Sequence, residues 1–218
     1  MLEKYIFIIE IIGTIAFASS GAMVGIKKQM DLLGVCVLGM TTAVGGGMIR
    51  DVILGVTPPI MFQNPTYALL AIAFSILIFC GMYFFQNKLT HSKVQGVYDK
   101  LMMIFDSLGL GLFTVVGVTT AINIGYETTA FLQIFVGVLT GVGGGVLRDI
   151  MAGNTPYIFV KHVYASASII GAIVCVLVEP WFGELTAMLV GAAVVFVIRI
   201  LAAHYKWNLP RIKQVEAK

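Results

Sequence analysis

One motif occurs twice in this chain, and its duplication constrains the fold more than any other feature. Thr41–Phe62 reads TTAVGGGMIRDVILGVTPPIMF, and Leu139–Val160 reads LTGVGGGVLRDIMAGNTPYIFV. Aligned at an offset of 98 residues, the two segments share eleven identities in 22 positions. The shared residues form a glycine triplet, an Arg-Asp pair three residues later, and a Gly-x-Thr-Pro segment. The chain therefore contains an internal repeat, and we call each copy of this motif a cassette.

The segments that precede the two cassettes also match, at an offset of 96 residues. The matching residues are Glu10, Gly13, Phe17 and Gly21 in the first copy and Asp106, Gly109, Phe113 and Gly117 in the second. Their spacing of i, i+3, i+7 and i+11 places each set along one stripe of a helix. Tyr67 and Tyr164 make a weaker match beyond the cassettes.

The composition indicates an integral membrane protein. The 218 residues are 59% hydrophobic and 11% charged, with a mean hydropathy of +0.96, whereas a soluble domain has about 25% charged residues. A helix needs about 20 apolar residues to cross a bilayer, and seven segments come close to or exceed this length. They are Tyr5–Ile26, Leu32–Val56, Tyr67–Phe85, Leu101–Ile122, Thr128–Ala152, Val163–Val178 and Leu185–Ala203.

Spans one to three are thus repeated as spans four to six. Because three is odd, the second copy enters the membrane from the opposite side, which gives an inverted repeat with a pseudo-two-fold axis in the membrane plane. We predict an all-α polytopic protein with two inverted three-helix repeats and a seventh helix. The predicted units are residues 1–90, 91–180, 181–205 and a basic cytoplasmic tail at 206–218.

Lysine and arginine predict the orientation, since cytoplasmic loops are enriched in both. Of the 14 Lys and Arg residues, eleven fall on the side of the odd-numbered loops and the C-terminus, and Arg199 is counted among them. Lys4 alone lies on the other side, and Arg50 and Arg148 fall within spans. We expect a protein of the inner (plasma) membrane with the N-terminus outside and the C-terminus in the cytoplasm.

The glycine triplets are predicted to break the second and fifth spans. They are Gly45, Gly46 and Gly47 in one cassette and Gly143, Gly144 and Gly145 in the other. Each glycine costs up to about 1 kcal/mol relative to alanine inside a helix. At 1.5 Å per residue both triplets lie about 20 Å along their spans, near the bilayer midplane. Broken helices that line a path are one interpretation, and close helix packing through small residues is the other.

Charged residues inside the spans indicate a pathway, because each costs about 3 kcal/mol or more in a bilayer. The cassettes place Arg50, Asp51, Arg148 and Asp149 there. Neighbours on a helix point about 100° apart, so we hypothesise pairing across the pseudo-symmetry, Arg50 with Asp149 and Arg148 with Asp51. A salt-bridged pin between the helices is an alternative role.

Two further acids, Glu10 and Asp106, lie nearer the ends of their spans and are predicted at the mouths of a path. They could instead cap neighbouring helices or stay protonated. Ser19, Ser20 and Thr114 offer oxygen ligands to a cation.

The polarity of broken helices does not decide the cargo. Half-helix N-termini favour an anion or carboxylate, whereas freed carbonyls favour a cation. A monovalent cation and a small zwitterion such as glycine therefore both remain candidates. Neither a catalytic triad nor a metal-ligand spacing stands out among the three cysteines and three histidines. We expect no enzyme, no cofactor and no nucleic-acid partner.

The duplicated GGG-x-x-Arg-Asp-x-x-x-Gly-x-Thr-Pro cassette, the seven spans and the outside N-terminus resemble the bacterial trimeric intracellular cation channel (TRIC) family, whose sequences are also labelled glycine-transporter-domain proteins. The resemblance covers about Tyr5 to Ala203. It implies a homotrimer with a separate pore in each protomer. It also implies conduction of monovalent cations, chiefly potassium, along second and fifth helices that kink at their glycines.

Overall fold

The protein is described here by a computed structural model, which covers residues 2–85, 91–126, 129–160 and 163–207. Loop residues 86–90, 127–128 and 161–162 and tail residues 208–218, which carry part of the charge expected at the cytoplasm, lie outside these ranges. Within the described residues the structure is all-helical. The helices are α1 Leu2–Lys27, α2 Leu32–Ile53, α3 Ile60–Gln63, α4 Thr66–Phe85, α5 His91–Asn123, α6 Ala130–Met151, α7 Tyr157–Val160, α8 Tyr164–Phe182 and α9 Glu184–His204.

Seven of these helices are long and apolar enough to cross a membrane, which confirms the predicted number of spans. Their bounds agree with the predicted ones within a few residues, except that α5 begins at His91 instead of Leu101. The added turns are polar, so hydropathy alone does not reveal them. They extend the helix past its apolar segment, and Asp99 there forms an exposed ion pair with Lys27 of α1 at 2.9 Å.

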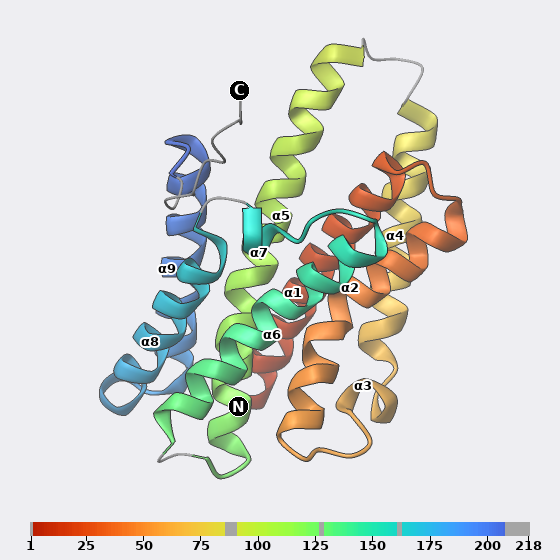
Figure 1. Cartoon of the computed structure of the whole chain (residues 1–218). Coiled ribbons are helices and arrows are strands. Elements are labelled where there is room, and N and C mark those ends of the chain that lie inside the picture. Colours follow the sequence, from red (N-terminus) through yellow and green to blue (C-terminus); the bar gives the residue numbers. More distant parts are fainter. Residues whose placement is uncertain (1, 86–90, 127–128, 161–162, 208–218) are drawn as a thin grey trace, which may run out of the picture.

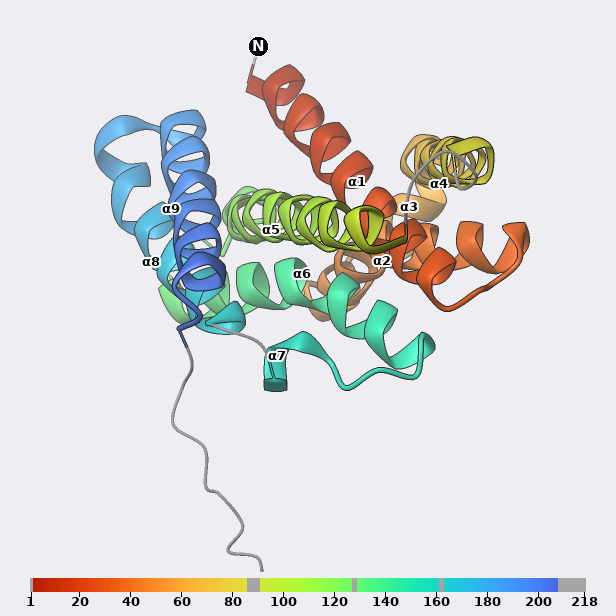
Figure 2. The ribbon, with the colours of Figure 1, turned by 90° about the horizontal axis from the view of Figure 1, so that it is seen from above.

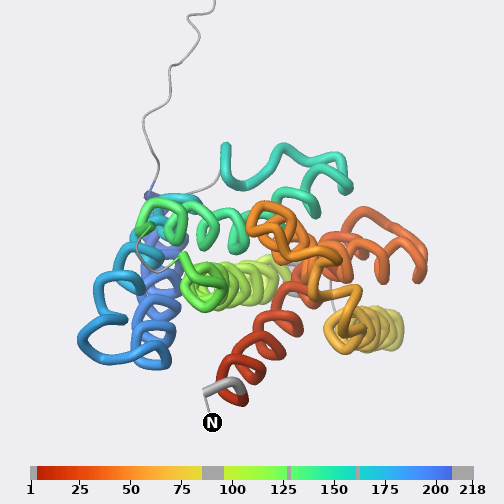
Figure 3. The backbone as a smooth tube through the Cα atoms, turned by 90° about the horizontal axis from the view of Figure 1, so that it is seen from below, coloured from red at the N-terminus to blue at the C-terminus, as the bar shows by residue number. Residues whose placement is uncertain are grey.

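The helices form two similar halves and one added element. In the first half α1 packs against α2 and α4, and in the second half α5 packs against α6 and α8. α1 and α5 also pack against each other at the centre, as do α2 and α6. α4 and the α8–α9 pair lie on opposite flanks, as the views from above and below show (Figure 2 and Figure 3). α1 begins near the lower edge of Figure 1 and α9 ends near the upper edge, as an odd number of spans requires.

Residues related by the repeat meet at the centre of the molecule. The rings of Phe17 and Phe113 stack with their centroids 5.3 Å apart. A Cβ atom added to Gly46 would lie 2.1 Å from the carbonyl oxygen of Thr140, and one added to Gly144 would lie 2.1 Å from that of Thr42. These matched contacts place the pseudo-two-fold axis between α2 and α6, where the glycine triplets cross.

The predicted break at each triplet is corrected by the structure. Both α2 and α6 run as continuous α-helices through their glycines, although α2 changes direction near the middle of its length (Figure 1). The close packing of the two backbones explains this, because the partner helix fills the space that water would need to satisfy an unwound segment.

Candidate functional site

Each half of the protein holds one cluster of charged and phenolic side chains, built from matching positions. The second-half cluster is buried, whereas the first-half cluster is partly exposed. An acid comes from the first helix of the repeat, the Arg-Asp pair from the second and a tyrosine from the third long helix. The first-half cluster consists of Glu10, Arg50, Asp51 and Tyr67. The second-half cluster consists of Asp106, Arg148, Asp149 and Tyr164.

The hypothesis that arginine and aspartate pair across the pseudo-symmetry is wrong. Nε of Arg50 donates to Oδ1 of Asp51 at 2.8 Å, and Nε of Arg148 donates to Oδ1 of Asp149 at 2.9 Å. The arginine side chain is long enough to fold back onto its sequence neighbour, despite the 100° between their positions on the helix. Each arginine also lies beyond the triplet of its own helix, so the two pairs lie on either side of the crossing.

Each aspartate has a second role, because it also fixes the loop that follows its helix. Oδ2 of Asp51 accepts a hydrogen bond from the backbone N–H of Ile60 at 2.9 Å, at the start of α3. Oδ2 of Asp149 accepts one from Tyr157 at 2.9 Å, at the start of α7. Pro59 stands at the position that matches Tyr157, and proline has no N–H to donate. The cassette thus joins the helix to its own Thr-Pro loop, and not to the other cassette helix as the pin interpretation requires.

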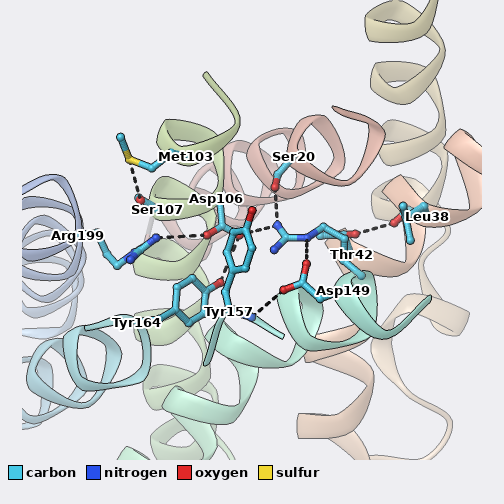
Figure 4. Close-up of polar contacts among 11 residues, drawn as sticks. Ser20, Leu38, Thr42, Met103, Asp106, Ser107, Asp149, Tyr157, Tyr164 and Arg199 are labelled. Atoms are coloured by element: carbon cyan, nitrogen blue, oxygen red, sulfur yellow. Dashed lines mark hydrogen bonds and ion pairs between the residues drawn. The ribbon is translucent and has the colours of Figure 1, made fainter. Parts of the chain in front are cut away.

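The side chains of the second-half cluster are at most 3% exposed, and Figure 4 shows the contacts among them. Nη1 of Arg148 donates at 2.6 Å to Oδ1 of Asp106 and at 2.6 Å to Oγ of Ser20 from α1. Tyr164 donates to the same Oδ1 at 3.3 Å. Asp106, expected at the mouth of a path, is 0% exposed, as is Arg148. Solvent therefore does not reach Asp106 or Arg148 in this structure.

Arg199 completes the second-half cluster, and the sequence did not predict it as a site residue. It extends from α9 toward Asp106, with Nη2 at 3.8 Å from Oδ2 (Figure 4). Its guanidinium also lies over the ring of Tyr164, 4.7 Å from the centroid. The prediction that Arg199 belongs to the cations of the cytoplasmic loops is wrong, because its side chain is 3% exposed and lies inside a spanning helix. The signal was present, since Arg199 stands between the apolar runs VVFVI and ILAA.

The first-half cluster surrounds a cavity instead. Tyr67 donates a hydrogen bond to Oε2 of Glu10, and these side chains, Arg50, Asp51 and Phe113 line a cavity of about 40 Å³. A polar cavity holds a water molecule once it offers about 10–15 Å³. The first half therefore has room for a few waters or a small ion where the second half is filled.

Three predicted oxygen ligands lie in different places. Ser20 contacts Arg148, as described above, and Ser19 is buried in α1. Thr114 lies apart from both clusters, because its hydroxyl is hydrogen-bonded to the carbonyl of Leu110 and to Ser168, each at 2.7 Å. Of the glycines, Gly47 lines the cavity, whereas Gly46 and Gly144 form the crossing.

The sequence model of the family described as Glycine transporter matches residues 7–83 and, a second time, residues 103–180. A UPF0126 membrane protein of Deinococcus radiodurans is 37% identical over 204 residues, which span 93% of this chain and 89% of the relative. The UPF0126 inner membrane protein YadS of Escherichia coli K12 is 34% identical over 207 residues, which span 94% and 95%. Both are membrane proteins, as the composition predicted.

Solved structures show the same architecture. A chain from a study of conductance through TRIC cation channels is 37% identical with a TM-score of 0.81, and the match covers 97% of this chain and 98% of that one. The TRIC orthologue of Rhodobacter sphaeroides is 30% identical with a TM-score of 0.80, at coverages of 93% and 98%. A prokaryotic TRIC channel in 0.5 M KCl is 29% identical with a TM-score of 0.84, at coverages of 96% and 100%.

The relatives are channel and membrane proteins and not enzymes, as expected. Because the family model matches both halves and the relatives align over nearly the whole chain, the protein belongs to the family described as Glycine transporter, with the UPF0126 membrane proteins, and has the fold of the prokaryotic TRIC channels.

Proposed function

We propose that the protein is a homotrimeric potassium channel of the inner membrane, with one pore in each protomer lined by α2 and α6. The observation that carries the proposal is the first-half cavity of about 40 Å³ beside the crossing of these helices. Its wall contains two carboxylates, from Glu10 and Asp51, and one guanidinium, from Arg50. Acidic side chains that face a cavity within the membrane attract cations and mark their pathway.

The relatives support the proposal for the cargo and the assembly. TRIC proteins at 30% to 37% identity are described as cation channels, and the Rhodobacter sphaeroides protein is described as trimeric. The repeat supports one pore per protomer, because it places a charged cluster on either side of the α2–α6 crossing within a single chain. We propose that the second-half cluster closes this pore and that its rearrangement opens it.

Secondary transport of a zwitterion such as glycine is the second candidate, and the description of the family favours it. Arg50 would contact the carboxylate of the solute and Glu10 its ammonium group. The volume of the cavity argues against this function, since about 40 Å³ suits an ion or a few waters better than an amino acid.

The test is to reconstitute the protein in liposomes and to measure voltage-driven potassium flux and glycine uptake on the same vesicles. We expect potassium flux that does not saturate, and a several-fold decrease in the Asp51→Asn variant because the cavity loses a negative charge. Asp99→Asn is the matched control, since it makes the same chemical change at an exposed residue outside the pore. Saturable glycine uptake without potassium flux would overturn the proposal.

A further inference from the structure

The two charged clusters occupy matching positions in the repeat, yet their formal charges differ. The second-half cluster, with Arg199 included, contains two carboxylates and two guanidiniums, of Asp106 and Asp149 and of Arg148 and Arg199. The first-half cluster contains the two carboxylates of Glu10 and Asp51 but only the guanidinium of Arg50. One positive charge therefore distinguishes the halves, and it comes from Arg199.

The origin of this charge explains the difference. Arg199 lies in α9, which stands outside the duplicated segments and has no counterpart in the first half. Its guanidinium fills the space beside Asp106 and Tyr164. The matching space beside Glu10 and Tyr67 is part of the 40 Å³ cavity. The cavity is thus the same site without the side chain that α9 supplies.

The contact between Arg199 and Asp106 is loose for a buried ion pair. The atoms Nη2 and Oδ2 are 3.8 Å apart, beyond hydrogen-bonding distance. Oδ2 of Asp106 is fully buried and has no hydrogen-bond donor among the described residues. By contrast, Oδ1 of the same carboxylate accepts hydrogen bonds from Arg148 and Tyr164. Asp106 therefore presents one occupied oxygen and one that lacks a ligand at close range.

We infer that Asp106 forms a second cation site, that Arg199 fills it as a tethered cation, and that conduction requires the guanidinium to give way to a monovalent cation. A buried carboxylate needs a counter-charge, and either cation supplies it. The exchange keeps the second-half cluster neutral, and it makes this half resemble the open cavity of the first. The site itself does not depend on the channel proposal, whereas its role in conduction rests on that proposal.

The site is tested by thermal unfolding of the purified protein in detergent, with potassium chloride replaced by N-methyl-D-glucamine chloride at constant ionic strength. In Arg199→Gln the carboxylate of Asp106 loses its tethered partner, so potassium binding should stabilise the variant. We expect potassium to raise the melting temperature of Arg199→Gln by several degrees more than that of the wild type. The double variant Asp106→Asn, Arg199→Gln should lose this added response. Equal potassium responses in Arg199→Gln and the wild type would overturn the inference.

The role in conduction is tested by potassium flux in liposomes. Arg199→Gln should conduct several-fold more than the wild type at the same voltage, and free guanidinium should inhibit the variant more strongly than the wild type. Lys28→Gln removes the same charge from an exposed position and should conduct like the wild type. If Arg199→Gln does not fold, Arg199→Met, which also removes the charge but keeps a long side chain, should exceed the wild type in its place. A flux at or below the wild-type value would overturn this role.

The two assays separate the two proposals. If neither the wild type nor Arg199→Gln conducts potassium, but potassium stabilises Arg199→Gln as expected, the cation site stands and the channel function fails. If the wild type conducts and the variant shows no added response to potassium, the channel function stands and the site at Asp106 fails.

Discussion

The two cassette arginines have the same sequence context but different surroundings, and their replacement should reveal this. Arg148 is fully buried and contacts Asp106, Asp149 and Ser20, whereas Arg50 lines a cavity. Removing one partner from a buried ion pair costs about 3–5 kcal/mol, because the other charge stays uncompensated. We expect Arg148→Gln to lose stability on this scale and Arg50→Gln clearly less, since water in the cavity can solvate the remaining carboxylates.

Unfolding of both variants in detergent, by heat or by denaturant, measures the difference. Lys28→Gln, at an exposed position, provides the baseline for losing one positive charge. Equal losses at Arg50 and Arg148 would show that the two clusters are equally dry, contrary to the structure.

At the residue scale, the sequence indicates which side chains are unusual inside the spans better than it indicates their partners. The cassette charges stand out because charged residues are rare inside apolar spans. The sequence does not predict the partners of the arginines correctly. The position of a residue on a helix gives the direction in which its side chain leaves the backbone, but not the place that the end of a long, flexible side chain reaches. Arg199 was counted as a loop residue because it lies near the end of its span, although it reaches inward to Asp106.

At the scale of the helices, the glycines of one triplet should differ sharply in their tolerance of alanine. A Cβ atom at Gly46 would lie 2.1 Å from a backbone oxygen of α6. At Gly47 the nearest atom to a Cβ, apart from the backbone of its own helix, is Nη2 of Arg50 at 3.8 Å. Backbone cannot move aside as a side chain can. We therefore expect Gly46→Ala to force α2 and α6 apart and to cost about 1–3 kcal/mol, as overpacking does.

Gly47→Ala is the matched control, because it makes the same change one residue away. It should retain the stability of the wild type or slightly exceed it, since alanine favours the helix by up to about 1 kcal/mol. Thermal unfolding compares the two variants. If Gly47→Ala proved as damaging as Gly46→Ala, flexibility of the triplet and not close packing would be its function.

The helices could largely be predicted from the sequence, because long apolar runs determine where a chain can cross a bilayer. What escaped prediction depends on other forces. The first turns of α5 are polar, and the short helices α3 and α7 are fixed by hydrogen bonds that their first N–H groups donate to Asp51 and Asp149. The continuity of α2 and α6 follows from a contact between distant segments, which a triplet of glycines in one helix does not reveal.

For the whole molecule, the duplication predicts symmetry and the structure shows where it ends. The repeat gives two clusters in matching positions. The helix α9, which lies outside the repeat, packs against α5 and α8 of the second half and brings Arg199 to Asp106. A protein with two equal halves would have two equal cavities. The seventh helix makes one half open and the other closed.

The orientation of the whole molecule is the last prediction. Lys27, Lys28 and Lys206 are exposed at the end of the molecule where α1 and α9 finish. Glu184 lies at the opposite end, where α9 begins. Positive charge favours the cytoplasmic side, so α9 should end in the cytoplasm. Alkaline phosphatase, which is active only outside the cytoplasm, should then be active when fused after Tyr126 and inactive when fused after Tyr205.

Green fluorescent protein fused at the same two positions should give the reverse pattern, because it fluoresces when it folds in the cytoplasm. This arrangement would place the second-half cluster, with Arg199, on the cytoplasmic side of the α2–α6 crossing and the first-half cavity on the outer side. An active phosphatase after Tyr205 would show that the orientation is the reverse of the predicted one. Cations from outside would then meet the tethered arginine before the open cavity.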